Sequence, residues 1–182
     1  MPGTLILLFH PAPARSHANA ALGRAAARLA GADIVDMQAT YPDAAIDTDA
    51  EVERLHRADR LVLQFPLQWY STPPLLKAWQ DAVLTRMFYL RPQEGAALRG
   101  MPLMLATTAG NHAAAYGPGG ENRFTLEELF RPLQATAHRC GLRWSAPFSL
   151  FSADRLDDAA LAAAGERYLS HLAAWQAEAM HA

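Results

Sequence analysis

Five short apolar runs rich in Ile, Val and Leu alternate along the chain with longer segments in which apolar residues recur at helical spacing. Runs that are apolar at every position are typical of parallel strands, because helices cover both faces of a parallel sheet. The pattern predicts an α/β fold with a doubly wound, five-stranded parallel sheet, most simply in the order 2-1-3-4-5, with helices on both faces. The predicted strands are residues 4–9, 32–36, 61–65, 103–107 and 147–151, and the predicted helices are residues 16–30, 49–58, 74–84, 124–140 and 157–179.

Several helix ends carry residues suited to caps. Ser16, Asp49 and Thr125 each precede an amphipathic run and can accept hydrogen bonds from unpaired amides. Gly141 stands where a left-handed residue would end the fourth helix. Two loops, residues 37–48 and the Gly-rich 109–122, are long, and long ordered loops are often functional.

Composition and charge narrow the class of protein. The 182 residues suit one compact domain covering residues 1–182. A net charge of -2, with 19% charged residues, argues against a nucleic-acid partner. The apolar start lacks the features of a signal peptide, and no stretch approaches the roughly 20 apolar residues needed to cross a bilayer. We therefore expect a soluble cytoplasmic protein whose membrane association is at most peripheral, through a partner.

Hydrolase and metalloenzyme chemistries lack their sequence signals. The single cysteine, Cys140, leaves no partner for an internal disulfide and no cysteine cluster for a metal. There is no Gly-x-Ser-x-Gly elbow, no paired-histidine zinc spacing and no Cys-x-x-Cys, and the seven histidines are scattered. We expect no metal site.

The loop after the first predicted strand suits a phosphate. Ligands of doubly wound sheets bind beyond the carboxyl ends of the strands. Here imidazole, hydroxyl and amide groups precede a helix, whose unpaired first amides bind anions. The glycine spacing of a P-loop or dinucleotide fingerprint is absent, and an ordinary capped helix is the alternative. The candidate residues are His10, Ser16, His17 and Asn19.

The loop after the third predicted strand suits a planar ring. It holds one Gln, two large aromatic residues and three prolines, which together give a stiff, apolar surface beside backbone amides. A flavin needs flat contact and hydrogen bonds at its pyrimidine edge, where reduction builds negative charge. We expect the amides of Leu67 to Trp69 to stabilise that charge, with core or interface aromatics as the alternative. The candidate ring contacts are Pro66, Leu67, Gln68, Trp69 and Tyr70.

The loop after the fourth predicted strand would complete such a site. Small residues there let the backbone approach a ligand edge, and Thr108 can donate a hydrogen bond. Tyr116 follows in the Gly-rich stretch, for which a flexible surface loop is the alternative. The candidate edge residues are Thr107, Thr108, Ala109 and Gly110.

These three loops resemble those of the flavodoxin-like NAD(P)H:quinone oxidoreductases. The run 65–79, the Thr107-Thr108 pair and His10-Pro11 with Ser16-His17-Ala18-Asn19 carry the resemblance, which covers nearly the whole chain. Within that family the chain most resembles the small bacterial members that accompany Kef-type, glutathione-gated potassium efflux systems. The resemblance implies a flavodoxin-like fold and a homodimer with flavin at the interface. It also implies two-electron transfer from NAD(P)H to a quinone by alternating, ping-pong binding.

The resemblance also implies roles for the residues. His10, Ser16, His17 and Asn19 would hold the flavin phosphate and ribityl chain, residues 66–70 would contact the ring, and residues 107–110 would edge it. Ala109 stands where larger members have glycine, and Arg123 stands where many relatives have histidine. Tyr116 matches a tyrosine placed over the substrate, so Tyr116 and Arg123 are the candidate catalytic side chains. The chain is too short for the extension that holds adenine, which favours FMN over FAD.

Other functions fit the same residues. The chain could act mainly as a regulatory subunit that docks on the cytoplasmic face of a Kef-type potassium/proton antiporter. A one-electron carrier is disfavoured by the small net charge, because such carriers usually have strongly acidic surfaces. An azoreductase or nitroreductase would differ in its acceptor but hardly in its site.

Overall fold

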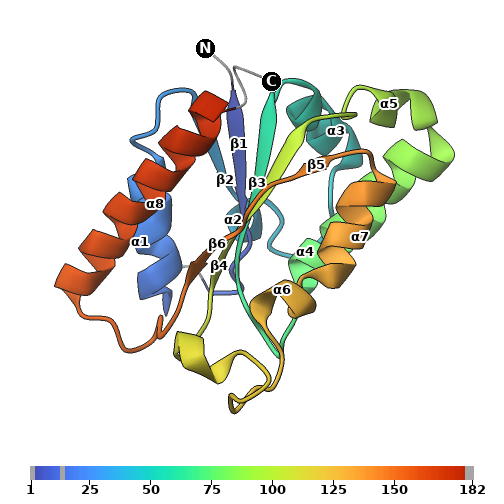
Figure 1. Ribbon diagram of the computed structural model, residues 1–182. Coiled ribbons are helices and arrows are strands. Elements are labelled where there is room, and N and C mark those ends of the chain that lie inside the picture. Colours follow the sequence, from blue (N-terminus) through green and yellow to red (C-terminus); the bar gives the residue numbers. More distant parts are fainter. Residues whose placement is uncertain (1–2, 13–14, 179–182) are drawn as a thin grey trace.

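The computed structural model of the chain describes residues 3–12 and 15–178 (Figure 1). Within these ranges, parallel strands form one sheet in the order β2-β1-β3-β4-β5, and β6 also pairs with β4. The predicted strand order is therefore confirmed. The strands are β1 (Thr4–Leu8), β2 (Ala32–Asp36), β3 (Arg60–Pro66), β4 (Pro102–Thr108), β5 (Arg143–Trp144) and β6 (Phe148–Leu150).

The last edge of the sheet differs from the prediction. The predicted strand 147–151 is β6, and the two-residue β5 precedes it on the same edge. Pro147 lies between them and has no N–H to give to a strand ladder, so the pairing with β4 is interrupted there.

Helices cover both faces of the sheet. On one face α1 and α8 lie side by side, and on the other lie α3, α4 and α7 (Figure 1). Each face has its own apolar core cluster, because the strand residues alternate between the two faces. The helices are α1 (His17–Ala26), α2 (Met37–Thr40), α3 (Thr48–His56), α4 (Pro74–Trp79), α5 (Pro92–Ala96), α6 (Leu126–Leu129), α7 (Arg131–Arg139) and α8 (Asp158–Glu178).

Three predicted caps are confirmed. The Ser16 hydroxyl accepts a hydrogen bond from the Asn19 amide, 3.2 Å away, at the start of α1. Thr125 forms a reciprocal capping box with Glu128 at the start of α6. Gly141 follows α7 with a φ of 69°, in the left-handed region that glycine adopts freely.

The predicted cap at Asp49 is wrong. Asp47 caps α3 instead, because its Oδ1 accepts hydrogen bonds from the amides of Asp49 and Ala50, both at 3.0 Å. Asp49 lies in the first turn of the helix, where an acidic side chain is also favourable.

Three predicted helices differ in extent from the structure. The predicted helix 124–140 is broken after α6, because Pro132 has no amide hydrogen to give to the carbonyl of the preceding turn. The predicted helix 74–84 continues from α4 through the wide, π-helical turns Gln80–Leu84 and Arg86–Leu90. The first helix stops at Ala26 instead of Ala30.

The last helix is described to Glu178, and its predicted end at Ala179 lies outside the described residues. Among the described helices, none is both long and apolar enough to cross a bilayer.

A buried carboxylate joins the helices of one face. Glu51 of α3 is fully buried and accepts hydrogen bonds from the Tyr41 hydroxyl and from Trp79 Nε1 of α4, each at 2.9 Å. Arg54 Nε also donates to it, at 3.2 Å. Because a buried charge is stable only when it is paired and hydrogen-bonded, these contacts fix α3 against α4.

We predict that Glu51→Ala lowers the free energy of unfolding by about 3 kcal/mol, because it leaves the buried Trp79 Nε1 without an acceptor and the Tyr41 hydroxyl with only the Asp47 carbonyl, 3.5 Å away. Urea denaturation measures the change. Glu53→Ala on the same helix is the matched control, since its exposed pair with Arg57 is worth about 0.5 kcal/mol or less. Equal losses in the two variants would contradict a structural role for the Glu51 contacts.

Candidate functional site

The loops after β1, β3 and β4 meet at the carboxyl ends of the strands, the lower edge of the sheet in Figure 1. Two hydrogen bonds to Thr108, the last residue of β4, bring them together. Asn19 Nδ2 in α1 donates to Thr108 Oγ1 at 2.8 Å, and the Leu67 amide donates to the Thr108 carbonyl at 2.8 Å. The three loops therefore lie together at this edge of the sheet.

The exit of β3 is a tight two-residue turn. The amides of Gln68 and Ser71 each donate to the other residue's carbonyl, both at 2.9 Å, so Trp69 and Tyr70 form the tip. Their φ values are 46° and 64°, positive at both central positions as in a type I′ turn. Bulky side chains rarely adopt this conformation, and such strain is concentrated at functional sites.

This turn presents its aromatic side chains to the outside. Trp69 is 94% exposed and Tyr70 is 48% exposed. The Tyr70 hydroxyl donates to Asn122 Oδ1 at 3.2 Å, which ties the turn to the Gly-rich loop. Aromatic rings that serve the apolar core are buried. These two rings are exposed, and the Tyr70 hydrogen bond holds the turn at the edge of the site.

The expectation that the amides of Leu67 to Trp69 all face a ligand is wrong for two of them. The Leu67 amide is bonded to Thr108 and the Gln68 amide to Ser71. Within the described chain, the Trp69 amide has no hydrogen-bond partner. The amides inside the turn, and not those before it, are therefore the groups that can bind an anionic ring edge.

The exit of β1 leads to the start of α1. The Ala12 amide donates to His10 Nδ1 at 3.0 Å, so the proton of the neutral ring is on Nε2, which is left as a donor. Burial lowers the pKa of His10 below its ordinary value, which keeps the ring neutral at pH 7. His17 is exposed in the first turn of α1, and Ser16 is half-buried.

The exit of β4 is mostly buried. Thr107 and Thr108 are covered, and Ala109 has its amide and carbonyl bonded to Leu150 and Ala153, at 2.8 and 3.0 Å. Gly110 is the first exposed residue after β4. A Cβ added to Gly110 would lie 2.9 Å from Asp154 Oδ2, so a larger residue there would require the Asp154 side chain to move.

Tyr116 lies in the Gly-rich loop and Arg123 follows it directly, so both candidate catalytic residues lie at the edge of the site, here called the rim. Tyr116 is half-buried with its ring centroid 5.7 Å from that of Phe151. Burial, and then the proximity of Tyr70, raise the pKa of Tyr116 above its ordinary value. Arg123 is exposed with a φ of 62°, and its amide donates to the Gly120 carbonyl at 3.1 Å.

Sequence reasoning missed the residues that support this rim. Asn122 accepts the Tyr70 hydrogen bond, and the loop after β6 holds the site through the Ser152 amide, which donates to the Asn111 carbonyl at 2.9 Å. The loop after β6 could have been included in the predicted site, because it follows the carboxyl end of a predicted strand of the same sheet.

The doubly wound parallel sheet is a flavodoxin-like fold. The chain belongs to the flavodoxin-like fold family, whose model matches residues 3–172. A glutathione-regulated potassium-efflux system ancillary protein KefF from Salmonella dublin is 43% identical over 178 residues, covering 94% of this chain and 96% of the relative.

Two solved structures are also similar. General stress protein 14 from Treponema denticola, in complex with FMN, has a TM-score of 0.86 and 33% identity, covering 95% of this chain and 99% of that chain. An NADPH-quinone reductase from P. pentosaceus has a TM-score of 0.80 and 27% identity, covering 93% of this chain and 96% of that chain.

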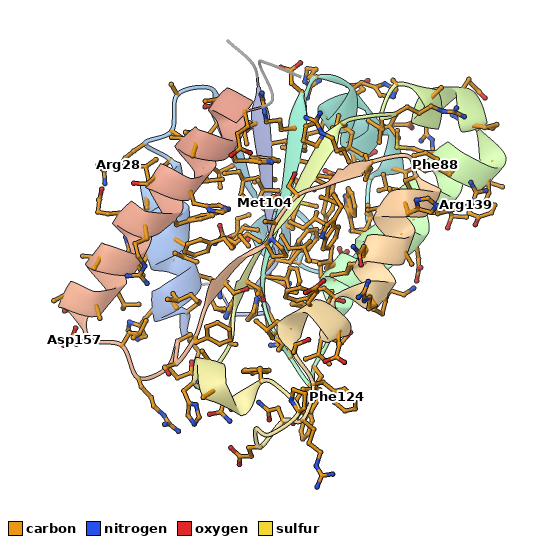
Figure 2. All side chains as sticks on the ribbon, viewed as in Figure 1. Arg28, Phe88, Met104, Phe124, Arg139 and Asp157 are labelled. Carbon is orange, nitrogen blue, oxygen red and sulfur yellow. The ribbon has the colours of Figure 1, made fainter. Side chains whose placement is uncertain are left out.

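We predict that Trp69→Asn raises the free energy of unfolding by about 1 kcal/mol, because asparagine adopts positive φ more readily and the exposed ring contributes little to the core. Urea denaturation of the cofactor-free protein measures it. Phe124→Asn is the control, since this exposed aromatic, seen at the lower edge of Figure 2, lies outside the left-handed region. A loss of stability in Trp69→Asn would show that the turn is not strained.

His10 gives a second prediction. Its folded-state pKa is lowered, so its contribution to stability is complete above about pH 6.5 and is lost as the pH falls through the folded pKa. Between about pH 7.5 and about pH 5 the wild type should therefore lose more unfolding free energy than His10→Asn, which keeps an acceptor for the Ala12 amide. Parallel pH profiles for the two proteins would exclude this role.

Proposed function

We propose that this protein is a flavin-dependent NAD(P)H:quinone oxidoreductase that binds FMN. The observation that carries the proposal is the strained, exposed Trp69–Tyr70 turn, fixed beside the start of α1 at the carboxyl edge of the sheet. The FMN-bound general stress protein 14 and the NADPH-quinone reductase that share this fold support it.

The residues present fit FMN. The start of α1 offers helix amides for a phosphate, with His17 exposed beside them and His10 Nε2 as a further donor. The Trp69–Tyr70 turn offers a flat wall and the free Trp69 amide for the ring edge, and Gly110 allows close approach from the β4 side. Bound there, FMN would supply the hydride-accepting chemistry.

The remaining candidate cofactor-binding residues lie behind the exposed residues of the site. Pro66, Leu67 and Gln68 are half-buried and hold the turn, while Asn19, Thr107, Thr108 and Ala109 are buried. We infer that these residues shape the site, and that direct contacts come from the exposed residues in front of them.

Tyr116 and Arg123 act on the substrate in this proposal. The raised pKa keeps the Tyr116 hydroxyl protonated at neutral pH, so it can donate a hydrogen bond to a quinone oxygen. The exposed guanidinium of Arg123 favours the negative charge that develops on that oxygen. NAD(P)H and quinone would use this rim in turn, because both are planar and the same aromatic wall suits either.

A second copy of the chain would complete the site. Trp69 and Tyr70 are adjacent exposed aromatic residues, and a homodimer would cover them. Such a dimer would act in the cytoplasm.

An ancillary role in potassium efflux is the second candidate. The 43% identical KefF relative, covered over nearly its whole length, favours it. The partner would be a Kef-type potassium/proton antiporter, and docking on it would account for any peripheral membrane association. Both roles are compatible in one protein, and co-purification with membranes that contain the antiporter would establish the second.

We predict ping-pong kinetics, with parallel double-reciprocal lines when NAD(P)H is varied at several quinone concentrations.

Trp69→Ala should weaken FMN binding at least about tenfold by removing the aromatic wall, as measured by fluorescence titration. Tyr89→Ala, which removes a 65% exposed ring outside the site, is the control and should bind FMN normally. Intersecting lines, or normal FMN binding by Trp69→Ala, would contradict the proposal.

A further inference from the structure

A buried glutamine interrupts an apolar face of the sheet. Gln64 of β3 is fully buried on the side covered by α1 and α8, where its neighbours include Val62, Met104 and Ala106. Figure 2 shows Met104 near the middle of the molecule. An apolar side chain at position 64 would pack there without the cost of burying an amide, so the glutamine requires an explanation.

The Gln64 side chain is hydrogen-bonded to α1, whose first turn forms the proposed phosphate site. Its Nε2 donates to the Asn19 carbonyl at 3.0 Å, in the first turn of α1. Asn19 in turn donates from Nδ2 to Thr108 Oγ1 at 2.8 Å. A chain of buried hydrogen bonds therefore joins β3, α1 and β4 at the level where their loops leave the sheet.

The same series of hydrogen bonds reaches the Trp69–Tyr70 turn, here called the ring turn. The Thr108 carbonyl accepts the Leu67 amide at 2.8 Å, and Leu67 is the residue before the Gln68–Ser71 bridge. Thr108 thus contacts α1 through its side chain and the turn through its backbone. A shift of the α1 start relative to the turn would stretch the Asn19–Thr108 or the Leu67–Thr108 hydrogen bond.

These contacts are retained at an energetic cost. Asn19 Oδ1 and Gln64 Oε1 are both buried and, within the described chain, neither has a hydrogen-bond partner. Buried acceptors without donors destabilise a fold. A polar network that stability alone would not select is best explained by the geometry that it fixes.

We propose that Gln64, Asn19 and Thr108 form a buried brace that sets the distance between the phosphate-binding start of α1 and the ring turn. Gln64 is then a positioning residue that has no access to the cofactor, because its side chain is fully buried. The inference rests on the proposed function and deepens it. The brace determines selection of a flavin that carries a phosphate over one that lacks it.

The test compares FMN with riboflavin, which has the same ring and no phosphate. Gln64→Leu removes the donor to Asn19, and Thr108→Val removes the acceptor from Asn19 with little change of shape. Each should weaken FMN binding about tenfold and change riboflavin binding less than about twofold, because only the phosphate end is displaced. Thr108→Ser keeps the hydroxyl and should restore the wild-type ratio of the two affinities.

Met104→Leu is the matched control, since it changes a buried apolar side chain on the same face of the sheet. Hydrogen exchange in the cofactor-free proteins gives a second readout. The amides of Asn19 and Ala20, which are hydrogen-bonded to Ser16, should exchange faster in Gln64→Leu and Thr108→Val than in the wild type, and no faster in Met104→Leu.

Unchanged affinity ratios, or equal weakening for both flavins, would overturn the brace. Unchanged exchange at the Asn19 and Ala20 amides in both variants would overturn it as well. If wild-type protein binds neither flavin, the proposed function fails together with the selectivity role. The exchange result would still separate that failure from the absence of a brace.

Discussion

The candidate site depends on the hydrogen bonds that converge on Thr108. Its carbonyl holds the Leu67 amide at the base of the ring turn, and its hydroxyl holds Asn19 in the first turn of α1. Parallel pairing of β3 with β4 runs as far as Pro66 and Thr108, so both strands end at the same level. Three loops that are far apart in the sequence therefore share one buried residue. The relative positions of these loops therefore follow from the pairing of β3 with β4.

The ring turn keeps an unfavourable conformation because its surroundings are rigid. Left-handed φ values at two aromatic residues cost about 1–3 kcal/mol each. The reciprocal Gln68–Ser71 bonds close the turn, and α4 starts at Pro74, where proline suits a first helical position. Through Trp79 and Glu51, α4 is in turn fixed to α3. The packed helices on this face of the sheet therefore hold the turn in its strained conformation.

Much of the fold could be predicted from the sequence, because fully apolar Val, Ile and Leu runs identify buried parallel strands. The rule that ligands bind beyond the carboxyl ends of strands also predicted that the loops after β1, β3 and β4 would lie together. The turn conformation could not be predicted, since positive φ at both positions is signalled by Asn-Gly and not by Trp69-Tyr70. The use of the Leu67 and Gln68 amides within the protein was equally hidden, because it depends on the level at which β3 and β4 end. The sequence pattern assigned the cap to Asp49, but the helix starts at Thr48 and Asp47 caps it, a start that the apolar pattern alone does not fix.

The central claim is that the strained turn and the start of α1 together hold a redox-active FMN. The most direct measurement is an absorbance spectrum of the protein after incubation with excess FMN and desalting, followed by anaerobic addition of NADPH and then of a simple quinone. The account predicts retained flavin bands that bleach with NADPH and return with quinone. Loss of FMN on desalting, with FAD also lost when tried alongside, would contradict it.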